Sequence, residues 1–147
     1  MIRNVGEDYT LRFILRDANK NSLSNVNSNS FEVMHGIPFK LSFITFPGTS
    51  TGGTRFLPFP VLGITDRGSN VVNTIKGHYV TVYLKDNPNN IKLLPLNEIK
   101  IPIEYGYALF RNLYIEKSGE YELFFETDMV IYLIHYNNIF ILTYFFF

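Results

Sequence analysis

Apolar and polar side chains alternate along several short segments of this chain of 147 residues. In the segment Tyr9-Thr10-Leu11-Arg12-Phe13, the side chains of Tyr9, Leu11 and Phe13 share one face, and those of Thr10 and Arg12 share the other. This period of two predicts a half-buried β-strand. Similar patterns predict further strands at residues 31–34, 39–44, 61–64, 79–84, 99–103, 107–115 and 120–125.

Turn-forming residues separate these segments at regular intervals. The separating sequences include Pro47-Gly48, Gly52-Gly53, Asp66-Arg67-Gly68 and Asn87-Pro88-Asn89-Asn90. No amphipathic helix is predicted before residue 129, which argues against a parallel α/β fold. About seven short strands at spacings of roughly ten residues are typical of a two-sheet antiparallel sandwich. We therefore expect an all-β antiparallel β-sandwich.

The strand at residues 9–13 has a counterpart near the other end of the chain. Ile2 and Gly6 have the same spacing as Ile115 and Gly119. After each glycine, a Tyr-x-Leu-x-Phe sequence follows, as Tyr9-Thr10-Leu11-Arg12-Phe13 and, 112 residues later, as Tyr121-Glu122-Leu123-Phe124-Phe125, with one residue inserted in the first copy. The alternative is two similar but unrelated edge strands. We favour a repeat whose period is one sandwich domain.

This repeat predicts the domain organisation. Residues 1–16 would be the last strand of a preceding repeat, and the Asn- and Ser-rich stretch 17–30 would be a linker or exposed loop. Residues 31–128 would form the sandwich, and residues 129–147 an apolar tail.

Packing roles can be assigned to six residues near the end of the expected sandwich. Gly106 and Gly119 permit tight turns, and Tyr121 repeats the Tyr9 position. The other side chains are expected in the core: Ala108 and Phe110, which point the same way, and Leu113, which re-enters the core with Ile115 after a turn.

The tail, residues 129–147, contains no charged side chain apart from a charge that His135 could carry, and it allows three interpretations. As a helix it would be roughly 28 Å long, enough to anchor the chain in a membrane. Against an anchor, His135, Asn137 and Asn138 lie near its middle, where polar groups are costly. The second interpretation is a gene-model artefact, a translated T-rich intron. The third is an extra buried strand.

The chain resembles filamin-type, immunoglobulin-like tandem repeats of large protozoan and bacterial surface proteins, such as the cysteine-repeat modular proteins of parasites. The resemblance covers most of residues 31–126. It is carried by the segments Phe31-Glu32-Val33, Leu41-Ser42-Phe43, Leu57-Pro58, Ile64-Thr65-Asp66-Arg67-Gly68-Ser69-Asn70, Val80-Thr81-Val82-Tyr83-Leu84, Gly106-Tyr107-Ala108-Leu109-Phe110-Arg111-Asn112-Leu113-Tyr114-Ile115 and Tyr121-Glu122-Leu123.

The resemblance implies an immunoglobulin-like sandwich that acts as a structural or adhesive, non-enzymatic module of a larger surface protein. Its partners would be neighbouring repeats of the same chain and a protein or glycan ligand that the sequence does not identify. The implied location is the cell surface or a membrane. The competing interpretation is a repeat of a cytoplasmic filamin-like rod that crosslinks the cytoskeleton.

Charge and cysteine content narrow the classes of function. Thirteen basic residues balance thirteen acidic ones, so no field of one sign draws the chain to nucleic acid, and we expect no nucleic-acid partner. The chain has no cysteine, which excludes disulfides, zinc–thiolate sites and thiol catalysis.

Candidate catalytic and metal-binding groups are scattered along the sequence. His35, His78 and His135 have no local partner at metal-ligand spacing. The other candidates are carboxylates at predicted strand ends, which we interpret as solvated turn residues: Asp66, Asp86 and Asp128. No nucleophile elbow, phosphate-binding loop or dinucleotide fingerprint occurs. We expect no enzymatic activity, no catalytic or metal-binding residues and no cofactor.

Aromatic side chains are the one candidate for partner binding. In the strand at 79–84, the pattern turns Val80 and Val82 toward the core and turns Tyr79 and Tyr83 outward. With Tyr114, these tyrosines could form an exposed strip for a partner. The alternative, which we favour, is that they form cross-strand packing pairs.

Overall fold

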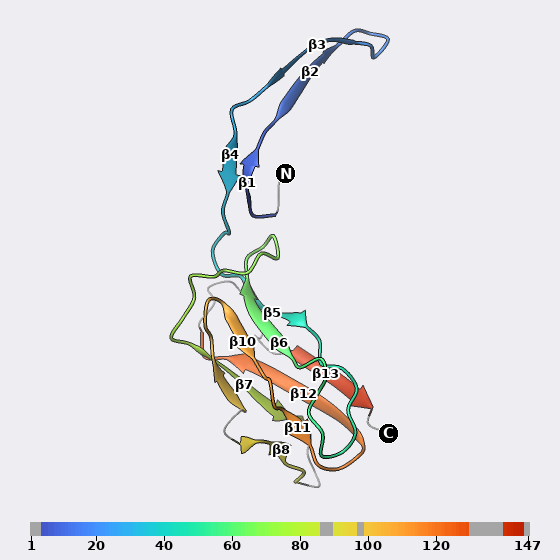
Figure 1. Ribbon diagram of the computed structural model, residues 1–147, viewed down its shortest axis with the longest axis vertical. Helices are drawn as coiled ribbons and strands as arrows, with labels where there is room; N and C mark the ends of the chain where they lie inside the picture. The colour runs from blue at the N-terminus through green and yellow to red at the C-terminus, as the bar shows by residue number, and fades with distance from the viewer. Residues whose placement is uncertain (1–3, 86–89, 97–98, 130–139, 146–147) are drawn as a thin grey trace.

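The computed structural model describes residues 4–85, 90–96, 99–129 and 140–145. Within these ranges every paired strand is antiparallel and no α-helix occurs. A β-sandwich forms the body of the molecule, and a long two-stranded arm projects from one end of it (Figure 1). The expected all-β antiparallel sandwich is confirmed, although the described residues contain thirteen strands instead of about seven.

The arm is a hairpin that is interrupted once along its length. Its four strands are β1 (Gly6–Tyr9), β2 (Arg12–Arg16), β3 (Ser22–Asn27) and β4 (Phe31–Val33). Strand β1 pairs with β4, and β2 pairs with β3. At the tip, the turn at 17–21 folds the chain back on itself.

The secondary structure of this region differs in part from that expected. An exposed loop is wrong for residues 22–27, because the tight turn before them brings them back to β2, where they pair as β3. The strand expected at residues 31–34 is present as β4, and it pairs with β1 in the arm. The boundaries between repeats, at 16, 30 and 128, stay predictions.

Two main sheets and a short pair of strands make the sandwich. The first sheet has the order β13 (Phe140–Phe145), β12 (Glu120–Thr127), β7 (Tyr79–Leu84) and β9 (Lys100–Pro102). The second has the order β10 (Tyr107–Leu109), β6 (Val61–Thr65) and β5 (Lys40–Thr45). Strands β8 (Leu93–Leu94) and β11 (Tyr114–Ile115) form the short pair.

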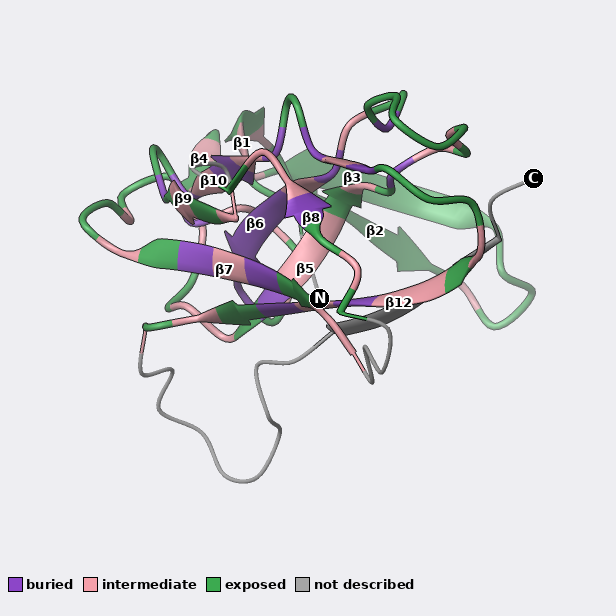
Figure 2. Ribbon diagram, turned by 90° about the horizontal axis from the view of Figure 1, so that it is seen from below, coloured by how far each residue is buried: buried purple, intermediate pink, exposed green. Residues whose placement is uncertain are grey.

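The core lies between the inner faces of the sheets, and the alternation along each strand selects its residues. The buried positions of β6, β7 and β12 are among the segments coloured purple in Figure 2. Three aromatic rings meet at its centre: the Phe125 ring packs edge-on to Phe43 at 5.3 Å and to Phe110 at 5.4 Å between ring centroids. The fully buried side chains include Phe56, Leu62, Ile64, Val80, Val82, Ala108, Phe110, Leu113, Ile115, Leu123 and Phe125.

Gly106 occupies a tight turn at the start of β10. Its φ angle is +82°, and a Cβ atom there would lie 2.5 Å from the carbonyl oxygen of Val72. The turn therefore requires glycine for its backbone conformation and for its close packing. The Gly106 N–H donates to the Ile75 carbonyl, and its own carbonyl accepts from the Ile64 N–H, which ties the turn to β6.

The apolar tail is described only in part. Residues 140–145 form β13, which pairs with β12 over the register Glu120↔Phe145 to Phe125↔Phe140. For these six residues, an antiparallel strand replaces the helix that a membrane anchor would need, because their apolar side chains have high β-propensity and β12 offers them an edge. Residues 130–139, which include His135, lie outside the described residues. Among the described residues, no helix is long and apolar enough to cross a membrane.

Replacing Phe125 by Ala should lower the free energy of unfolding by about 3–5 kcal/mol, because it leaves a cavity between two other rings. Phe13 is the matched control, since it holds the same position in the other Tyr-x-Leu-x-Phe sequence but is exposed. Its replacement by Ala should cost no more than about 0.5 kcal/mol. Urea unfolding followed by circular dichroism measures both, and equal losses would contradict this description of the core.

Candidate functional site

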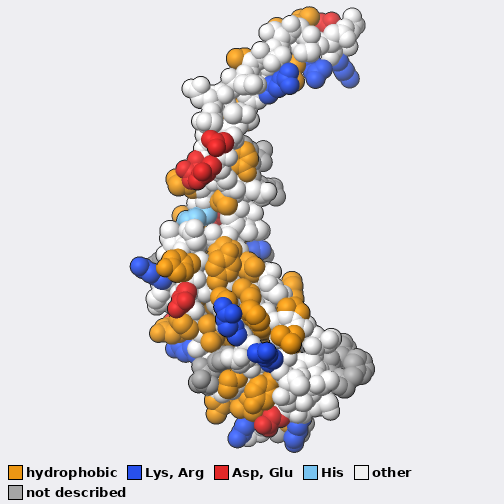
Figure 3. Space-filling model, in the orientation of Figure 1, with side chains coloured by type: hydrophobic (Ala, Val, Ile, Leu, Met, Phe, Trp, Pro, Cys, Tyr) orange, Lys and Arg blue, Asp and Glu red, His pale blue; other side chains and the backbone are white. Residues whose placement is uncertain are grey.

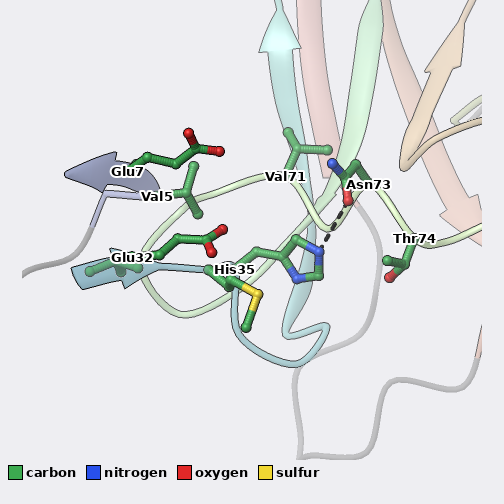
Figure 4. A pocket seen from close by; sticks show the side chains of 10 residues that line it. Val5, Glu7, Glu32, His35, Val71, Asn73 and Thr74 are labelled. Carbon is green, nitrogen blue, oxygen red and sulfur yellow. Dashed lines mark hydrogen bonds between the residues drawn. The ribbon is translucent and has the colours of Figure 1, made fainter. Parts of the chain in front are cut away.

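The arm joins the sandwich at an open groove of about 580 Å³. One wall comes from the arm and the other from the loop that follows β6 (Figure 4). Glu7 and Glu32 lie on the arm side, and acidic side chains gather at this level of the surface (Figure 3). Val71, Asn73 and Thr74 lie on the sandwich side.

Asp66 is the polar centre of this joint, and the residue is 5% exposed. It lies directly after β6, where the chain turns. Its Oδ1 accepts the backbone N–H of Gly68 at 2.8 Å and that of Asn70 at 2.9 Å, and its Oδ2 accepts the N–H of Gly36 at 2.7 Å. The Asn70 side-chain amide donates to both carboxylate oxygens at 3.1 Å. Asp66 thus closes its own turn and also holds the segment that leaves the arm.

These contacts shift the pKa of Asp66. Burial alone would raise it, but the hydrogen bonds from Gly36, Asn70 and Gly68 outweigh burial and bring the pKa below the usual 3.8. The charged form is therefore the one that the fold stabilises. The solvated turn residue expected from the sequence is corrected: the turn is there, but the carboxylate is buried, because three backbone donors replace its water.

The turn at the tip of the arm has the same construction. Asp17 Oδ1 accepts the N–H groups of Asn19 and Asn21, and the Asn21 amide donates to Oδ2. The fourth residue of each turn has a positive φ angle, 67° at Lys20 and 69° at Ser69. The shared signal is an aspartate followed four residues later by an asparagine, and our reading of the sequence missed it. Only in the second turn is the aspartate buried, and that turn also bonds to the segments that lead into and out of the arm.

His35 also bridges the groove. Its Nε2 lies 3.1 Å from the Oδ1 of Asn73 (Figure 4). Its Nδ1 lies 3.1 Å from the carbonyl oxygen of Gly36. His78 lies elsewhere, with its Nδ1 at 3.4 Å from the Asp128 carboxylate, which also accepts the N–H of Tyr79. In the part of the chain that the structure describes, no three His, Asp or Glu side chains are grouped to hold a metal ion. Asp86 lies outside the described residues.

The three candidate tyrosines lie on two strands that belong to different sheets: Tyr79 and Tyr83 on β7, and Tyr114 on β11. Tyr79 and Tyr83 are on the exposed face of β7, where the Lys100 Nζ lies 4.7 Å from the Tyr79 ring centroid. Tyr83 stacks on Phe124 of β12 at 5.5 Å. This is the geometry of a cross-strand packing pair. Tyr114 lies in β11, which pairs with β8. Partner binding by these residues stays a prediction.

Comparison with known proteins adds no assignment. No model of a known protein family matches the chain, and no curated protein matches it in sequence. The site is therefore interpreted from its geometry.

Acid should weaken the joint through Asp66. Its pKa is lowered in the folded state, so its stabilising effect is complete at neutral pH and is lost as the pH falls through about 3.8 toward the lower folded-state value. Asp66→Asn should lower the free energy of unfolding at pH 7 by about 2 kcal/mol or more, because the buried donors lose a charged acceptor. The variant should also lose stability less steeply than the wild type between about pH 5 and 3.

Urea titrations across this pH range measure both effects. Asp17→Asn is the control, because it changes the same kind of turn where it is exposed, and it should leave most of the acid dependence intact. Equal acid slopes for wild type and Asp66→Asn would show that Asp66 does not carry the effect.

Proposed function

We propose that the chain is a structural, non-enzymatic module of a tandem array, in which the arm hairpin β2–β3 is the last hairpin of a preceding module. The array would form a rod whose modules connect through their last strands. The observation that carries this proposal is the comparison of the two Tyr-x-Leu-x-Phe segments. Their starts and their antiparallel partner strands are alike, but only the segment in β12 is one continuous strand covered by a core.

Both strands lead into a hairpin of the same order. The strand with Phe125 is followed by β13, and Phe125 pairs with Phe140. The strand with Phe13 is followed by β3, and Phe13 pairs with Val26. In each case the second strand returns antiparallel along the edge of the first. The likeness of the two regions therefore extends beyond the five residues that repeat in sequence.

The start of each strand is also built alike. A Cβ atom at Gly6 would lie 2.9 Å from the Tyr9 ring, and one at Gly119 would lie 3.1 Å from the Tyr121 ring. Each tyrosine thus packs on the backbone of the preceding glycine, and its hydroxyl donates to a carbonyl just before it, that of Asn4 at 3.3 Å or of Ser118 at 3.4 Å.

A bulge absorbs the residue inserted in the first copy. The register of β1 shifts between Gly6 and Tyr9, and Asp8 within this interval has a φ angle of +57°. Such a bulge takes up one extra residue and leaves the alternation after it unchanged. Tyr9 ends β1 and Phe13 lies in β2, with Thr10 and Leu11 between the two strands.

The two copies differ in burial. Leu123 and Phe125 are 0% exposed, whereas Leu11 and Phe13 are 45% and 59% exposed. Burying a Leu or Phe side chain fully contributes about 1.5–3 kcal/mol of stabilising free energy. A partner that covers Leu11 and Phe13 would therefore be bound favourably. The inner face of a second sandwich of this kind is the surface that covers the same side chains in β12. This match supports a preceding module as the partner.

A structural role is also what the resemblance to surface-protein repeats implies. The placement of the rod at a cell surface depends on that resemblance alone, and a cytoplasmic rod of the filamin type would use the same connection between modules.

The test is a fusion in which a copy of residues 31–114 is placed directly before Ile2, so that residues 2–16 replace the missing last strand of the copy. The proposal predicts that the copy folds, because Leu11 and Phe13 complete its core. Hydrogen exchange should then show the amides of residues 9–16 protected more strongly than in the single chain, and limited proteolysis should spare both modules.

Two neighbouring substitutions in β2 provide the matched control. Phe13→Asp charges the face that would enter the added core, whereas Ile14→Asp charges the opposite face of the same strand. Only Phe13→Asp should unfold the added copy. A copy that stays unfolded in the fusion, or equal effects of the two substitutions, would contradict the proposal.

A further inference from the structure

We propose that the turn at Asp66–Asn70 is an intermodule clamp that fixes the direction of the preceding module relative to this one. Its partner is the ribbon by which that module enters and leaves the joint, at Val5 and Gly36. This inference rests on the proposed tandem array and adds how two consecutive modules are oriented.

The clamp holds the ribbon at two points. Asn70 Oδ1 accepts the backbone N–H of Val5, just before β1, at 3.1 Å. Asp66 Oδ2 accepts the backbone N–H of Gly36, just after β4, at 2.7 Å. One attachment would let the ribbon swing about that point. Two attachments, one where the ribbon begins and one where it ends, are supplied by one turn and also restrict the rotation of the ribbon.

Asn70 is suited to connect the two partners. Its amide nitrogen donates to the Asp66 carboxylate, which leaves the amide oxygen to accept from Val5. The opposite orientation would place oxygen against oxygen at Asp66 and donor against donor at Val5. The carboxylate therefore determines which way the amide points. An aspartate at position 70 would place a second negative charge beside Asp66.

Backbone hydrogen bonds and buried side chains also anchor the base of this turn. Thr65 and Val71 form an antiparallel bridge across its base, and the Val72 N–H donates to the Ile64 carbonyl at 2.8 Å. Ile64, Thr65 and Val72 are all buried. The turn is thus an extension of the central strand of a sheet, so a force on the ribbon is passed directly to the core.

His35 adds a third contact at the same joint. It follows β4 and reaches Asn73, two residues beyond the bridge. The groove between arm and sandwich lies beside these contacts and is spanned by them. Polar contacts of this kind depend on direction, which is what a fixed angle between modules requires.

The turn at Asp17 shows which hydrogen bonds belong to the turn motif and which belong to the clamp. It has the same internal hydrogen bonds and the same positive φ angle, yet in the described structure no hydrogen bond links its Asp17 or Asn21 side chain to another segment. The bonds to Val5 and Gly36 are therefore additions to a turn that is complete without them.

The clamp can be tested by measuring distances between spin labels, because the chain has no cysteine and two can be introduced. Asn25→Cys in β3 and Lys117→Cys in the sandwich are both exposed positions. In the otherwise unchanged chain, the distance distribution should be a single narrow peak. Asn70→Ala and Val5→Pro remove the same hydrogen bond from its two ends, and each should make the distribution about twice as broad or shift its maximum.

Asn21→Ala is the control, because it deletes the equivalent asparagine at the tip of the arm and should leave the distribution unchanged. Thermal melts of all variants show whether the sandwich remains folded, and Val5→Pro leaves the turn itself intact. A broad distribution in the unchanged chain, or narrow distributions in both joint variants, would overturn the clamp.

The same labels in the fusion described above separate the two proposals. An added module that folds while the joint variants keep a narrow distribution would leave the tandem array standing and remove the clamp. An added module that does not fold would instead remove the array.

Discussion

An alternating strand has one apolar face, and that face must be covered by another apolar layer. In the sandwich this requirement is met, since the inner side chains of β6, β7 and β12 meet across the aromatic cluster at Phe125. Their burial outweighs the entropy lost in ordering short strands and long loops. In the arm the same pattern occurs without a cover. This contrast between two parts of one chain is the basis of the proposed tandem array.

The joint between arm and sandwich is held by a different kind of interaction. Burial of apolar surface is not directional, so it can bring two modules together without setting their angle. Hydrogen bonds to a buried carboxylate are directional and are costly to break one at a time. In the proposed array, the apolar strand face would therefore provide affinity for a neighbouring core, and the Asp66 turn would provide orientation.

The sequence predicted the strands and their buried faces correctly wherever the alternation of apolar and polar side chains determines the structure. The outward and inward residues of β7 and the buried positions around Ala108 and Phe110 follow from alternation and turn residues alone. The sequence did not predict strands that depend on pairing with a distant segment. Strand β3 has a polar, Asn-rich sequence and forms because the Asp17 turn returns it to β2. The burial of Asp66 was also missed, since its donor at Gly36 lies 30 residues away in the chain. The sequence predicts the turn at Asp66 but not the segment at Gly36 that packs on it.

The face of β2 opposite Phe13 affects how the arms of two molecules interact in solution. An uncovered apolar ribbon with free edges is a template for edge-to-edge association. By strand alternation, Arg12 lies on the side of β2 opposite Phe13. Arg16 follows a register shift, and its guanidinium donates to the Lys20 carbonyl at 2.8 Å. Basic side chains are visible along this part of the arm in Figure 3. Two arms that approach each other would bring these like charges together. In the proposed array, this repulsion would disfavour the association of two arms and leave the apolar face open to the preceding module.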